Sequence, residues 1–523
     1  MTARAAVGAG LMPARAARSI RPGERIHVVG AAGAGASAAA LLAHHAGAVV
    51  SGCDPGGPSP YTPALEAAGL SLAWKHDPAH ITDGLRPDRL AVTKALTAIA
   101  PDHPELVAAR RAGIPIEPWQ QVVADAATGR TLIGVAGTHG KSTSAGWLVH
   151  VLVAAGADPS AFVGALLPAD LTGGIPATAR GGRGAPFVVE ADEYAGNFDA
   201  YRPAIAIVTS AEWDHPDVFA DRAAVVAAFD QWLRLAADEA AGGEVPTLIA
   251  NVADEGVAQL ATGLHDWPGR IVATALLEAP AQRLASFGRG MAEEFRSAIG
   301  PATVVLGRVA AAAPATTTLE IHGLDPLHGA VAVQLPTAGR HNAANALGVA
   351  AAALAAGIAP DPIAAGLASF PGVGRRLERK GEAGGVTVYD DYGHHPTAIR
   401  ETLAAVRQRE PGRRVWAVYE PLTYHRTAAL LEGFAAALAD ADGVAIAEIW
   451  AGRDPDTTIA SATGLAEAVA KRRPGLTAAA PGSVEATAKW LADAVKPGDV
   501  VLVMGGGRSY RIGELLLDDL GRR

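Results

Sequence analysis

The sequence predicts a three-domain α/β protein, on two observations. Short runs rich in valine and isoleucine alternate with longer alanine-rich stretches, as in βαβ units with parallel strands. This alternation starts again twice, and 523 residues are enough for about three domains of roughly 100–200 residues each. We place the boundaries near Thr128 and Arg375, which gives domains 1–128, 129–375 and 376–523.

The composition fits a well-buried protein with an acidic net charge. Half of the residues are hydrophobic, 19% are charged, and the net charge is -9. This charge argues against a nucleic-acid partner, because neutralising phosphates requires a basic surface. Cys53 is the only cysteine, which excludes an intramolecular disulfide and a zinc site built from cysteines. No apolar run is long enough to span a bilayer, so we expect a cytoplasmic protein.

The first twenty residues carry Arg4, Arg15 and Arg18 among alanines. A secretory signal would have a long apolar run here, and this segment has none. We expect Met1 to Ile20 to be a disordered lead-in.

The first domain begins with a strand and a glycine-rich turn. The predicted strand covers Ile26 to Gly30, and Gly33 and Gly35 precede an alanine-rich helix. The pattern fits the G-x-G-x-x-A fingerprint of dinucleotide-binding proteins, with Asp54 near the spacing of a ribose-binding acid. A nicotinamide-dependent dehydrogenase is therefore one alternative, although it gives no role to the motifs of the other domains.

The second domain begins with a phosphate-binding loop. A predicted strand, Leu132 to Ala136, leads into Gly137-Thr138-His139-Gly140-Lys141-Ser142-Thr143 and an apolar helix. Backbone N–H groups in such a loop, together with the helix dipole, bind anions. We expect Lys141 to bind the β- and γ-phosphates of a nucleotide and the Ser142 hydroxyl to ligate Mg²⁺.

Two groups of acids in the same domain are candidates for further magnesium ligands. The run Glu190-Ala191-Asp192-Glu193 follows the apolar Phe187 to Val189, and Asp214-His215 follows the predicted strand Ile205 to Thr209. Open α/β sheets bind their ligands at the carboxyl ends of strands. We therefore predict metal binding at both places, in preference to helix caps and a structural histidine.

The third domain contains four strand candidates separated by helical stretches: Val386 to Tyr389, Val415 to Tyr419, Gly443 to Ile449 and Val500 to Met504. In the second domain, a glycine-rich segment, Gly173 to Gly184, is predicted to be a loop. Ligands of such a protein are expected in the clefts between its domains.

Taken together, these motifs resemble those of the Mur ligases, in order, through all three domains. In the middle domain the resemblance rests on the phosphate loop, on the acids at 190–193, and on Glu212-Trp213-Asp214-His215, Gly339 to Ala346 and Gly374-Arg375-Arg376. The third domain adds the very specific Asp390-Asp391-Tyr392-Gly393-His394-His395-Pro396-Thr397. This string resembles a motif of two branches of the family. One branch attaches L-alanine to UDP-N-acetylmuramate, and its sister branch attaches a recycled tripeptide. The resemblance implies Rossmann-like first and third domains around a P-loop ATPase-like middle domain.

The resemblance also implies a role for each matching residue. Those expected to bind ATP are Gly137, Thr138, His139, Gly140, Lys141, Ser142, Thr143, Asn342, Asn345, Arg376 and Asp391. Those expected around Mg²⁺ are Ser142, Glu190 and His215. The UDP-sugar is expected at Gly33, Gly35, Asp54 and Thr97, and the amino acid at Tyr392, His394 and Arg426. The implied catalytic residues are Lys141, Glu190, His215, Arg376 and His394.

The implied reaction is an ATP-dependent ligation in peptidoglycan precursor synthesis, with ATP and Mg²⁺ as cofactors. ATP would convert the carboxylate of UDP-N-acetylmuramate to an acyl phosphate, and the amine of L-alanine would then displace phosphate. Lys141, Arg376 and Mg²⁺ would neutralise charge on the phosphoryl group. Closure of the third domain would exclude water from the acyl phosphate. The sequence leaves the oligomeric state open.

The sequence departs from the alanine-adding branch at several positions. Thr423 stands where an arginine is expected, although Arg426 is present and His425 is a candidate to compensate. His103 stands where an asparagine is usual. Losing one buried charge-assisted contact costs about 1.5–3 kcal/mol. Two alternatives therefore stay open: a ligase that uses another amino acid or a peptide, and a homologue that binds nucleotide without turnover.

Overall fold

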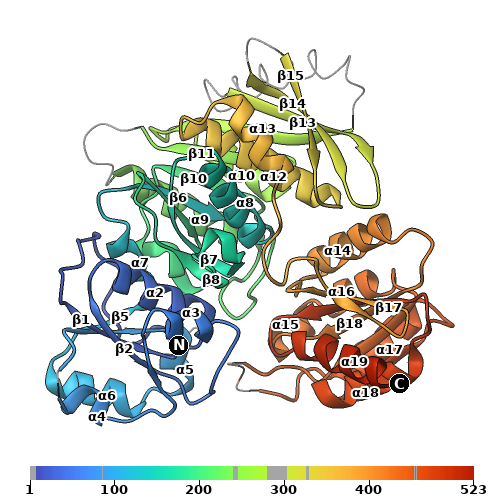
Figure 1. Ribbon diagram of the computed structural model, residues 1–523, viewed down its shortest axis with the longest axis horizontal. Helices are drawn as coiled ribbons and strands as arrows, with labels where there is room; N and C mark the ends of the chain where they lie inside the picture. Colours follow the sequence, from blue (N-terminus) through green and yellow to red (C-terminus); the bar gives the residue numbers. More distant parts are fainter. Residues whose placement is uncertain are drawn as a thin grey trace.

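The computed structural model describes residues 7–84, 86–238, 245–278, 303–325, 329–452, 454 and 456–523. Within these residues the strands form three sheets of five, ten and six strands, each associated with helices (Figure 1). The sheets follow one another along the chain, so the predicted three-domain α/β architecture is confirmed.

The N-terminal sheet is parallel throughout, in the order β3-β2-β1-β4-β5. Its strands are β1 (Arg25–Val29), β2 (Val49–Cys53), β3 (Leu72–Ala73), β4 (Arg89–Val92) and β5 (Ile116–Pro118). The helices are α2 (Ala34–His45), α3 (Thr62–Ala67), α4 (Ala79–Thr82), α5 (Lys94–Ile99), α6 (Pro104–Ala112) and α7 (Trp119–Ala126). Because strand side chains alternate between faces, α2 and α7 share a core with Val28, whereas α4 and α6 pack with Val29 on the other face.

The segment before β1 is ordered, so the prediction of a disordered lead-in is wrong for its described part. Arg15 Nε lies 2.9 Å from Glu117 Oε1, and Arg18 Nη2 lies 2.6 Å from Glu24 Oε1. Both carboxylates are buried and need a cationic partner. Arg15 and Arg18 of this segment supply that partner. Residues 1–6 lie outside the described residues.

The central sheet has the order β15-β14-β13-β12-β11-β10-β6-β9-β7-β8. Its strands are β6 (Thr131–Ala136), β7 (Ser160–Leu167), β8 (Ala177–Arg180), β9 (Pro186–Glu190), β10 (Ile205–Val208), β11 (Thr247–Asn251), β12 (Arg270–Leu277), β13 (Thr303–Ala312), β14 (Thr317–Asp325) and β15 (Gly329–Leu335). Its helices are α8 (Lys141–Ala154), η1 (Ala169–Leu171), η2 (Tyr194–Ala200), α9 (Arg222–Asp238), α10 (Glu255–Gly263), α12 (Arg340–Ala355) and α13 (Pro360–Ala368). The prediction of a loop from Gly173 to Gly184 is wrong for β8, which pairs antiparallel with β7 at the sheet edge.

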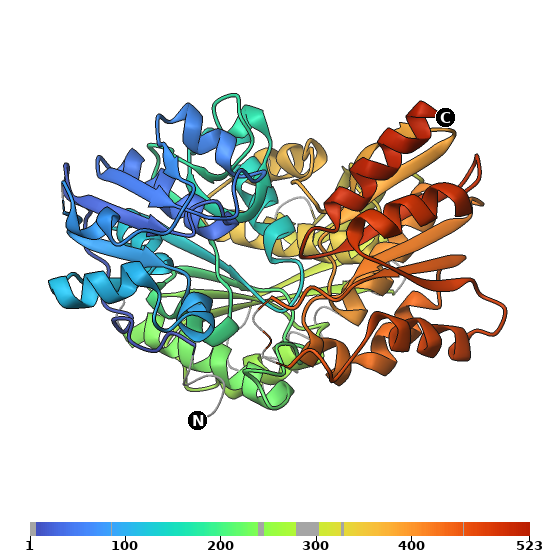
Figure 2. The same cartoon turned by 90° about the horizontal axis from the view of Figure 1, so that it is seen from below.

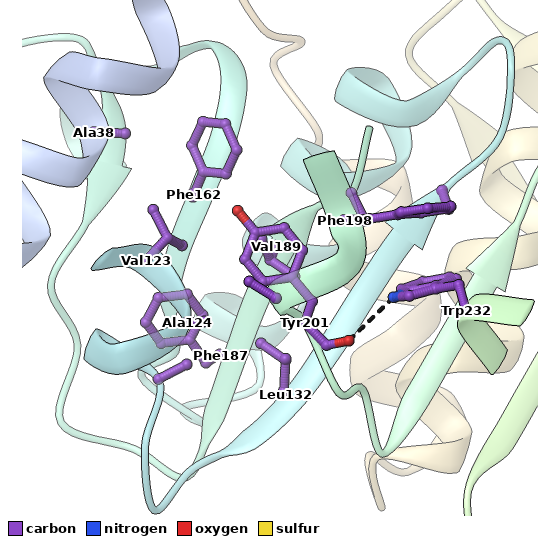
Figure 3. Packing of buried hydrophobic residues seen from close by; sticks show 14 of the residues in the cluster. Ala38, Val123, Ala124, Leu132, Phe162, Phe187, Val189, Phe198, Tyr201 and Trp232 are labelled. Carbon is purple, nitrogen blue, oxygen red and sulfur yellow. Dashed lines mark hydrogen bonds between the residues drawn. The ribbon is translucent and has the colours of Figure 1, made fainter. Parts of the chain in front are cut away.

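The N-terminal and central domains share one hydrophobic core. Ala38 of α2 and Val123 of α7 belong to the same buried cluster as Phe162 of β7 (Figure 3). The cluster continues to Trp232 of α9, whose indole Nε1 donates to Tyr201 O at 3.1 Å. Because this packing is continuous, the N-terminal and central domains are held against each other by one buried cluster.

The C-terminal sheet has the order β16-β17-β21-β18-β19-β20, with only β16 antiparallel to its neighbour. Its strands are β16 (Glu378–Ala383), β17 (Val386–Asp391), β18 (Val415–Glu420), β19 (Gly443–Ala447), β20 (Ala478–Gly482) and β21 (Val500–Gly505). The helices are α14 (Pro396–Arg409), α15 (Tyr424–Ala429), α16 (Leu431–Leu438), α17 (Ala462–Arg472), α18 (Val484–Ala494) and α19 (Tyr510–Arg522). Figure 2 shows this orange and red domain on one side of the molecule and the blue N-terminal domain on the other.

Candidate functional site

A cavity of about 1190 Å³ opens between the three domains, at the carboxyl ends of β6, β9 and β17. Predicted site residues that line it are Gly35, Thr138, His139, Gly140, Lys141, Ser142, Thr143, Glu190, His215, Asn342, Asn345, Arg376, Asp391, Tyr392, His394 and Arg426. The predicted residues that do not line it are Gly33, Asp54, Thr97 and Gly137. Residues that are distant in the sequence therefore line the same cavity.

The phosphate loop has a shape that requires its glycines. Gly140 has φ 78°, and a Cβ there would stand 2.5 Å from Asn345 Oδ1. Gly137 has φ 130°, and its Cβ would meet Thr209 Oγ1 at 2.2 Å. Both positions combine a left-handed backbone with a close neighbour, which glycine alone tolerates. Helix α8 begins at Lys141, so its N-terminus points at the loop as an anion site requires.

Lys141 is held among acids at the mouth of this loop. Its Nζ donates to Gly137 O at 2.6 Å and to Glu193 Oε2 at 3.0 Å, and lies 3.8 Å from Asp192 Oδ1. Burial alone would lower the pKa of Lys141, but Glu193 and Asp192 raise it above its usual value. The lysine is therefore charged, as phosphate binding demands. Burial raises the pKa of Glu193 to about 7 against the pull of Lys141.

The oxygen atoms beside the loop fit a magnesium ion. Ser142 Oγ donates to Glu190 Oε1 at 2.9 Å, while Glu190 Oε2 accepts from the Gly164 N–H at 2.6 Å. Two adjacent ligands of an octahedral Mg²⁺, each about 2.0–2.1 Å from the ion, stand roughly 2.9 Å apart. Arg376 also reaches this point, since its Nη2 donates to Ser142 Oγ at 2.7 Å. The predicted pair Ser142 and Glu190 is thus brought together.

His215 lies in a neighbouring group of acids. A nitrogen of its ring and carboxylate oxygens of Asp192 and Glu193 lie within 4.8 Å of one another. However, Arg426 Nη2 is 3.0 Å from His215 Nδ1. Arginine can only donate, so Nδ1 accepts and Nε2 carries the proton of the neutral ring. Coordination of an ion by His215 therefore requires release of this contact with Arg426.

The predicted amino-acid pocket is a buried charge network that crosses the domain boundary. Arg426 Nε donates to Asp214 Oδ1 at 2.7 Å. Burial would raise the pKa of the Asp214 carboxyl, but the Arg426 guanidinium holds it well below its usual range. Burial, followed by the charge of Arg426, lowers the pKa of His394 well below its usual value. His394 is therefore a neutral ring beside a fixed charge pair.

Two arginines connect the central and C-terminal domains. Arg375 Nε donates to Asp390 Oδ2 at 3.0 Å, and the guanidinium carbons of Arg375 and Arg376 lie 5.0 and 4.9 Å from the ring centroid of Tyr392. Arg375 has φ 57°, an uncommon conformation for a residue with a side chain. Asp391 accepts from the backbone N–H groups of Leu377 and Gly393 at 2.8 and 2.7 Å. These contacts tie the segment at Arg375 to Leu377 to the end of β17.

The predicted UDP-sugar residues occupy different settings. A Cβ at Gly35 would stand 2.2 Å from the Trp119 ring, so this glycine allows α2 to approach α7. Asp54 Oδ2 accepts from the Ala32 N–H at 3.1 Å, within the turn after β1. Thr97 is buried, and its Oγ1 accepts from the Gly8 N–H at 2.7 Å.

Comparison with known proteins identifies the family. Residues 25–131 match the model of the Mur ligase family catalytic domain, residues 135–353 the Mur ligase middle domain, and residues 375–507 the Mur ligase glutamate ligase domain. The chain is 34% identical to a UDP-N-acetylmuramate–L-alanine ligase of Frankia casuarinae, covering 95% of this chain and 98% of that protein. It is 36% identical to the ligase of that name from Kineococcus radiotolerans, with coverages of 95% and 97%. The chain belongs to the Mur ligase family.

Solved structures of Mur ligases have the same fold. A UDP-N-acetylmuramate-alanine ligase of Thermotoga maritima superposes with a TM-score of 0.71 at 22% identity, covering 94% of this chain and 98% of that one. A murein peptide ligase of Psychrobacter arcticus gives a TM-score of 0.69 at 25% identity, with coverages of 96% and 99%. Among the described residues, no helix is both long and apolar enough to cross a membrane.

This Mur ligase also has cavity residues to which the sequence assigned no individual role, namely Glu212, His395 and Thr397. Thr397 Oγ1 donates to Glu212 Oε2 at 2.7 Å, and the rings of His139 and His395 lie 4.6 Å apart between centroids. Both contacts cross from the central to the C-terminal domain. Glu193, the buried partner of Lys141, was part of the acid group predicted to bind metal but had no role of its own. Its position three residues after the buried strand β9 was the available signal.

Proposed function

We propose that the chain is an ATP-dependent ligase that joins L-alanine to the carboxylate of UDP-N-acetylmuramate, in the cytoplasm and in peptidoglycan precursor synthesis. The observation that carries this proposal is the shared cavity, where the phosphate loop of the central domain faces Arg376 and His394. The relatives that cover nearly the whole chain bear the name of this activity. The proposed division into domains 1–128, 129–375 and 376–523 separates the three sheets.

ATP is proposed to bind with its phosphates on residues 137–143. Lys141 is charged at this position, and Arg376 already lies 2.7 Å from Ser142. These two cations would neutralise charge on the phosphoryl group during its transfer. Asn345 packs against Gly140, and its amide is proposed to contact the nucleotide. Asn342 is proposed to contact the adenine side, and Asp391 the ribose after domain closure.

Mg²⁺ is proposed to bind at Ser142 and Glu190, with His215 as a third ligand after Arg426 turns away. A bound magnesium ion would screen the phosphate charges and favour departure of ADP. The chain's own contribution is to hold the sugar carboxylate in line with the phosphoryl group of ATP, and then the amine beside the acyl carbon, while excluding water.

The amino acid is proposed to bind at Tyr392, His394 and Arg426. The carboxylate of L-alanine would compete with Asp214 for the Arg426 guanidinium. The neutral ring of His394 offers a lone pair to the incoming amine. Release of Arg426 from His215 on substrate binding would then couple the amino-acid pocket to the metal site.

The acceptor side of the pocket contains one specific departure. Thr423 lines the cavity, while His425 pairs with Asp454, with Nδ1 and Oδ1 3.1 Å apart. His425 does not line the cavity, so it is not placed to replace the missing arginine. The smaller Thr423 leaves room for a longer acceptor, which makes the recycled tripeptide the second candidate.

The deciding experiment measures phosphate release from ATP with UDP-N-acetylmuramate, adding L-alanine, glycine, L-serine and the tripeptide one at a time. We expect release that requires both the sugar nucleotide and L-alanine. Release with the tripeptide alone would retain the ligase and change its acceptor. No release with any acceptor, from protein that binds ATP, would contradict the proposal and favour a binding-only homologue. Lys141→Ala protein is the blank.

A further inference from the structure

A second cluster of metal-binding side chains lies under the N-terminal sheet, away from the cavity. Its members come from β1, the end of β2, the segment up to α4 and the start of α6: His27, Cys53, His76, His80, His103 and Glu105. None of the six lines the cavity. Figure 1 shows α4 and α6 together on the side of the sheet opposite α2. The proposed ligase reaction gives this cluster no role.

The buried carboxylate of Glu105 stands at the centre of the cluster. Cys53 Sγ lies 3.2 Å from each of its oxygens, His27 Nε2 lies 3.8 Å from Oε2, and His80 Nδ1 lies 2.6 Å from Oε1. Two ligands about 2.0–2.3 Å from a tetrahedral ion stand roughly 3.3–3.8 Å apart. The spacings from Glu105 to Cys53 and His27 are therefore close to those of ligands that share one ion.

His27 points an unsatisfied nitrogen into this group. The residue is 2% exposed, its Nδ1 is 2.8 Å from Ser51 Oγ, and its Nε2 has no hydrogen-bond partner. In the tautomer that carries its proton on Nδ1, His27 donates to Ser51 and the lone pair of Nε2 is directed at Glu105. Histidine ligands of metals are oriented in this way, by a hydrogen bond from the other ring nitrogen.

His103 provides a second sign that the cluster is incomplete. It is 5% exposed, and neither of its ring nitrogens has a hydrogen-bond partner. Its ring packs edge-on against His76, with centroids 4.2 Å apart. Burying polar atoms without partners is costly.

We propose that His27, Cys53, His80 and Glu105 form a binding site for one transition-metal ion of the zinc class. In the four side chains the ligand atoms lie within 4.8 Å of one another. A set of sulfur, imidazole and one carboxylate suits Zn²⁺ and disfavours Mg²⁺ and Ca²⁺, which prefer oxygen ligands. The two histidines and Glu105 complete a four-ligand metal site that Cys53 alone could not form.

Binding requires the Cys53 thiol proton to leave, and His80 must give up the hydrogen bond between its Nδ1 and Glu105 Oε1. Burial, reinforced by Glu105, raises the pKa of the Cys53 thiol, so the sulfur is protonated without the ion. The sulfur–metal bond forms as the S–H bond breaks, and the proton passes to solvent. Glu105 is already ionised: burial would raise its pKa, but hydrogen-bonding neighbours hold it at about 2. Affinity for the metal therefore rises with pH.

The site would tie together the elements that carry the proposed UDP-sugar loops. Cys53 directly precedes Asp54, and His27 is in the strand that leads to the glycine turn. His76 and His80 have side chains that are 21% and 18% exposed, which gives an ion a route from solvent. A bound ion would stabilise the folded N-terminal domain without touching the reacting groups.

The test uses Co²⁺ as a spectroscopic probe on the full-length chain, stripped by a chelator and saturated with Mg²⁺. Because Cys53 is the only cysteine, a thiolate-to-cobalt charge-transfer band can arise at this site alone. We expect the band to saturate at one equivalent, to disappear on adding Zn²⁺, and to strengthen with pH. Zinc should also slow the reaction of Cys53 with a thiol reagent at least tenfold.

Variants locate the remaining ligands. His80→Ala should weaken cobalt binding at least tenfold, and Cys53→Ala should abolish the band. His265→Ala, which removes an exposed histidine elsewhere, should change neither. Absence of the band from wild-type protein with an intact circular dichroism spectrum would overturn the proposal, as would an unchanged zinc equivalent in a Cys53→Ala/His80→Ala double variant. The wild-type titration does not depend on any variant folding.

Discussion

Arg426 Nε and Asp214 Oδ1 lie 2.7 Å apart and form a buried ion pair between the C-terminal and central domains. The same guanidinium contacts His215 Nδ1 at 3.0 Å. Arg426, which is proposed to bind the amino acid, is therefore in contact with His215, which is proposed to bind the metal ion. Occupation of either site by its ligand would change the partners of the other.

Replacing Arg426 by lysine should weaken amino-acid binding selectively. Lysine keeps the charge but loses the forked geometry that can hold two carboxylates. We expect KM for L-alanine to rise about 10- to 150-fold, equivalent to about 1.5–3 kcal/mol. KM for ATP should not change, as steady-state assays would show. Arg508→Lys, at an exposed pair with Glu485, is the matched control. Equal increases in both KM values would contradict the assignment.

Lys141→Ala should abolish ATP-dependent ligation while leaving the fold intact. The substitution removes the cation at the phosphate loop, and the buried Glu193 can then take up a proton, because its pKa is already about 7. Phosphate release and circular dichroism test the two parts of this prediction. Lys75→Ala, at an exposed pair with Asp77, should retain full activity. Wild-type turnover by Lys141→Ala protein would remove the phosphate-loop assignment.

Gly35→Ala should destabilise the protein through packing alone. The new methyl group would stand 2.2 Å from the Trp119 ring, and overpacking of this kind costs about 1–3 kcal/mol. Gly263→Ala is the matched control, because that helical position has no atom within 4 Å of the added Cβ. Thermal unfolding should show a lower midpoint for the first variant and no loss for the second. Equal midpoints would show that α2 shifts without cost.

The success of sequence reasoning here has a physical basis. Strands such as β6 and β21 are buried on both faces, so they appear as continuous apolar runs that the sequence displays directly. The phosphate loop could also be located, because its glycines and lysine are adjacent in the sequence. Strand β8 was missed because it is a short edge strand with glycines on both sides, and such a strand has no apolar run of its own.

Contacts across domains could not be predicted from local patterns. The pairs Arg426–Asp214 and Thr397–Glu212 join residues separated by 212 and 185 positions. Charge alone does not indicate which acid a given arginine meets. Likewise, Arg15 appeared in the sequence as part of a disordered segment, because its partners Glu117 and Asp125 lie more than 100 positions away.

Glu190→Gln should raise the Mg²⁺ requirement more than His215→Ala does. Glu190 supplies a carboxylate oxygen next to Ser142, whereas His215 is engaged by Arg426. Mg²⁺ binds anionic oxygen in preference to neutral nitrogen. Magnesium titrations of ligase activity check the order, with Glu255→Gln at an exposed ion pair as the control. An unchanged titration for His215→Ala would remove that residue from the metal site.

Asp390 should make stability depend on pH in a direction opposite to most carboxylates. Burial raises its pKa from 3.8 to about 6 against the attraction of Arg375. Folding therefore takes up a proton between these values, so the contribution of Asp390 is fully present below about pH 4 and is lost as pH rises through 6. The loss amounts to at most about 3 kcal/mol, at about 1.4 kcal/mol per pKa unit.

Comparison of two variants isolates this effect. The stability of wild type relative to Asp390→Asn should fall from pH 4 to pH 6. The midpoint of thermal unfolding measures this difference. Asp499 is the opposite case. Burial would raise the pKa of its carboxyl, but hydrogen bonds, the strongest of them with Arg414, outweigh burial and lower it. Stability relative to Asp499→Asn should therefore fall as the pH is lowered. If both differences changed in the same direction, Arg375 would be holding Asp390 ionised, and the proposed balance between burial and ion pairing at the domain junction would be wrong.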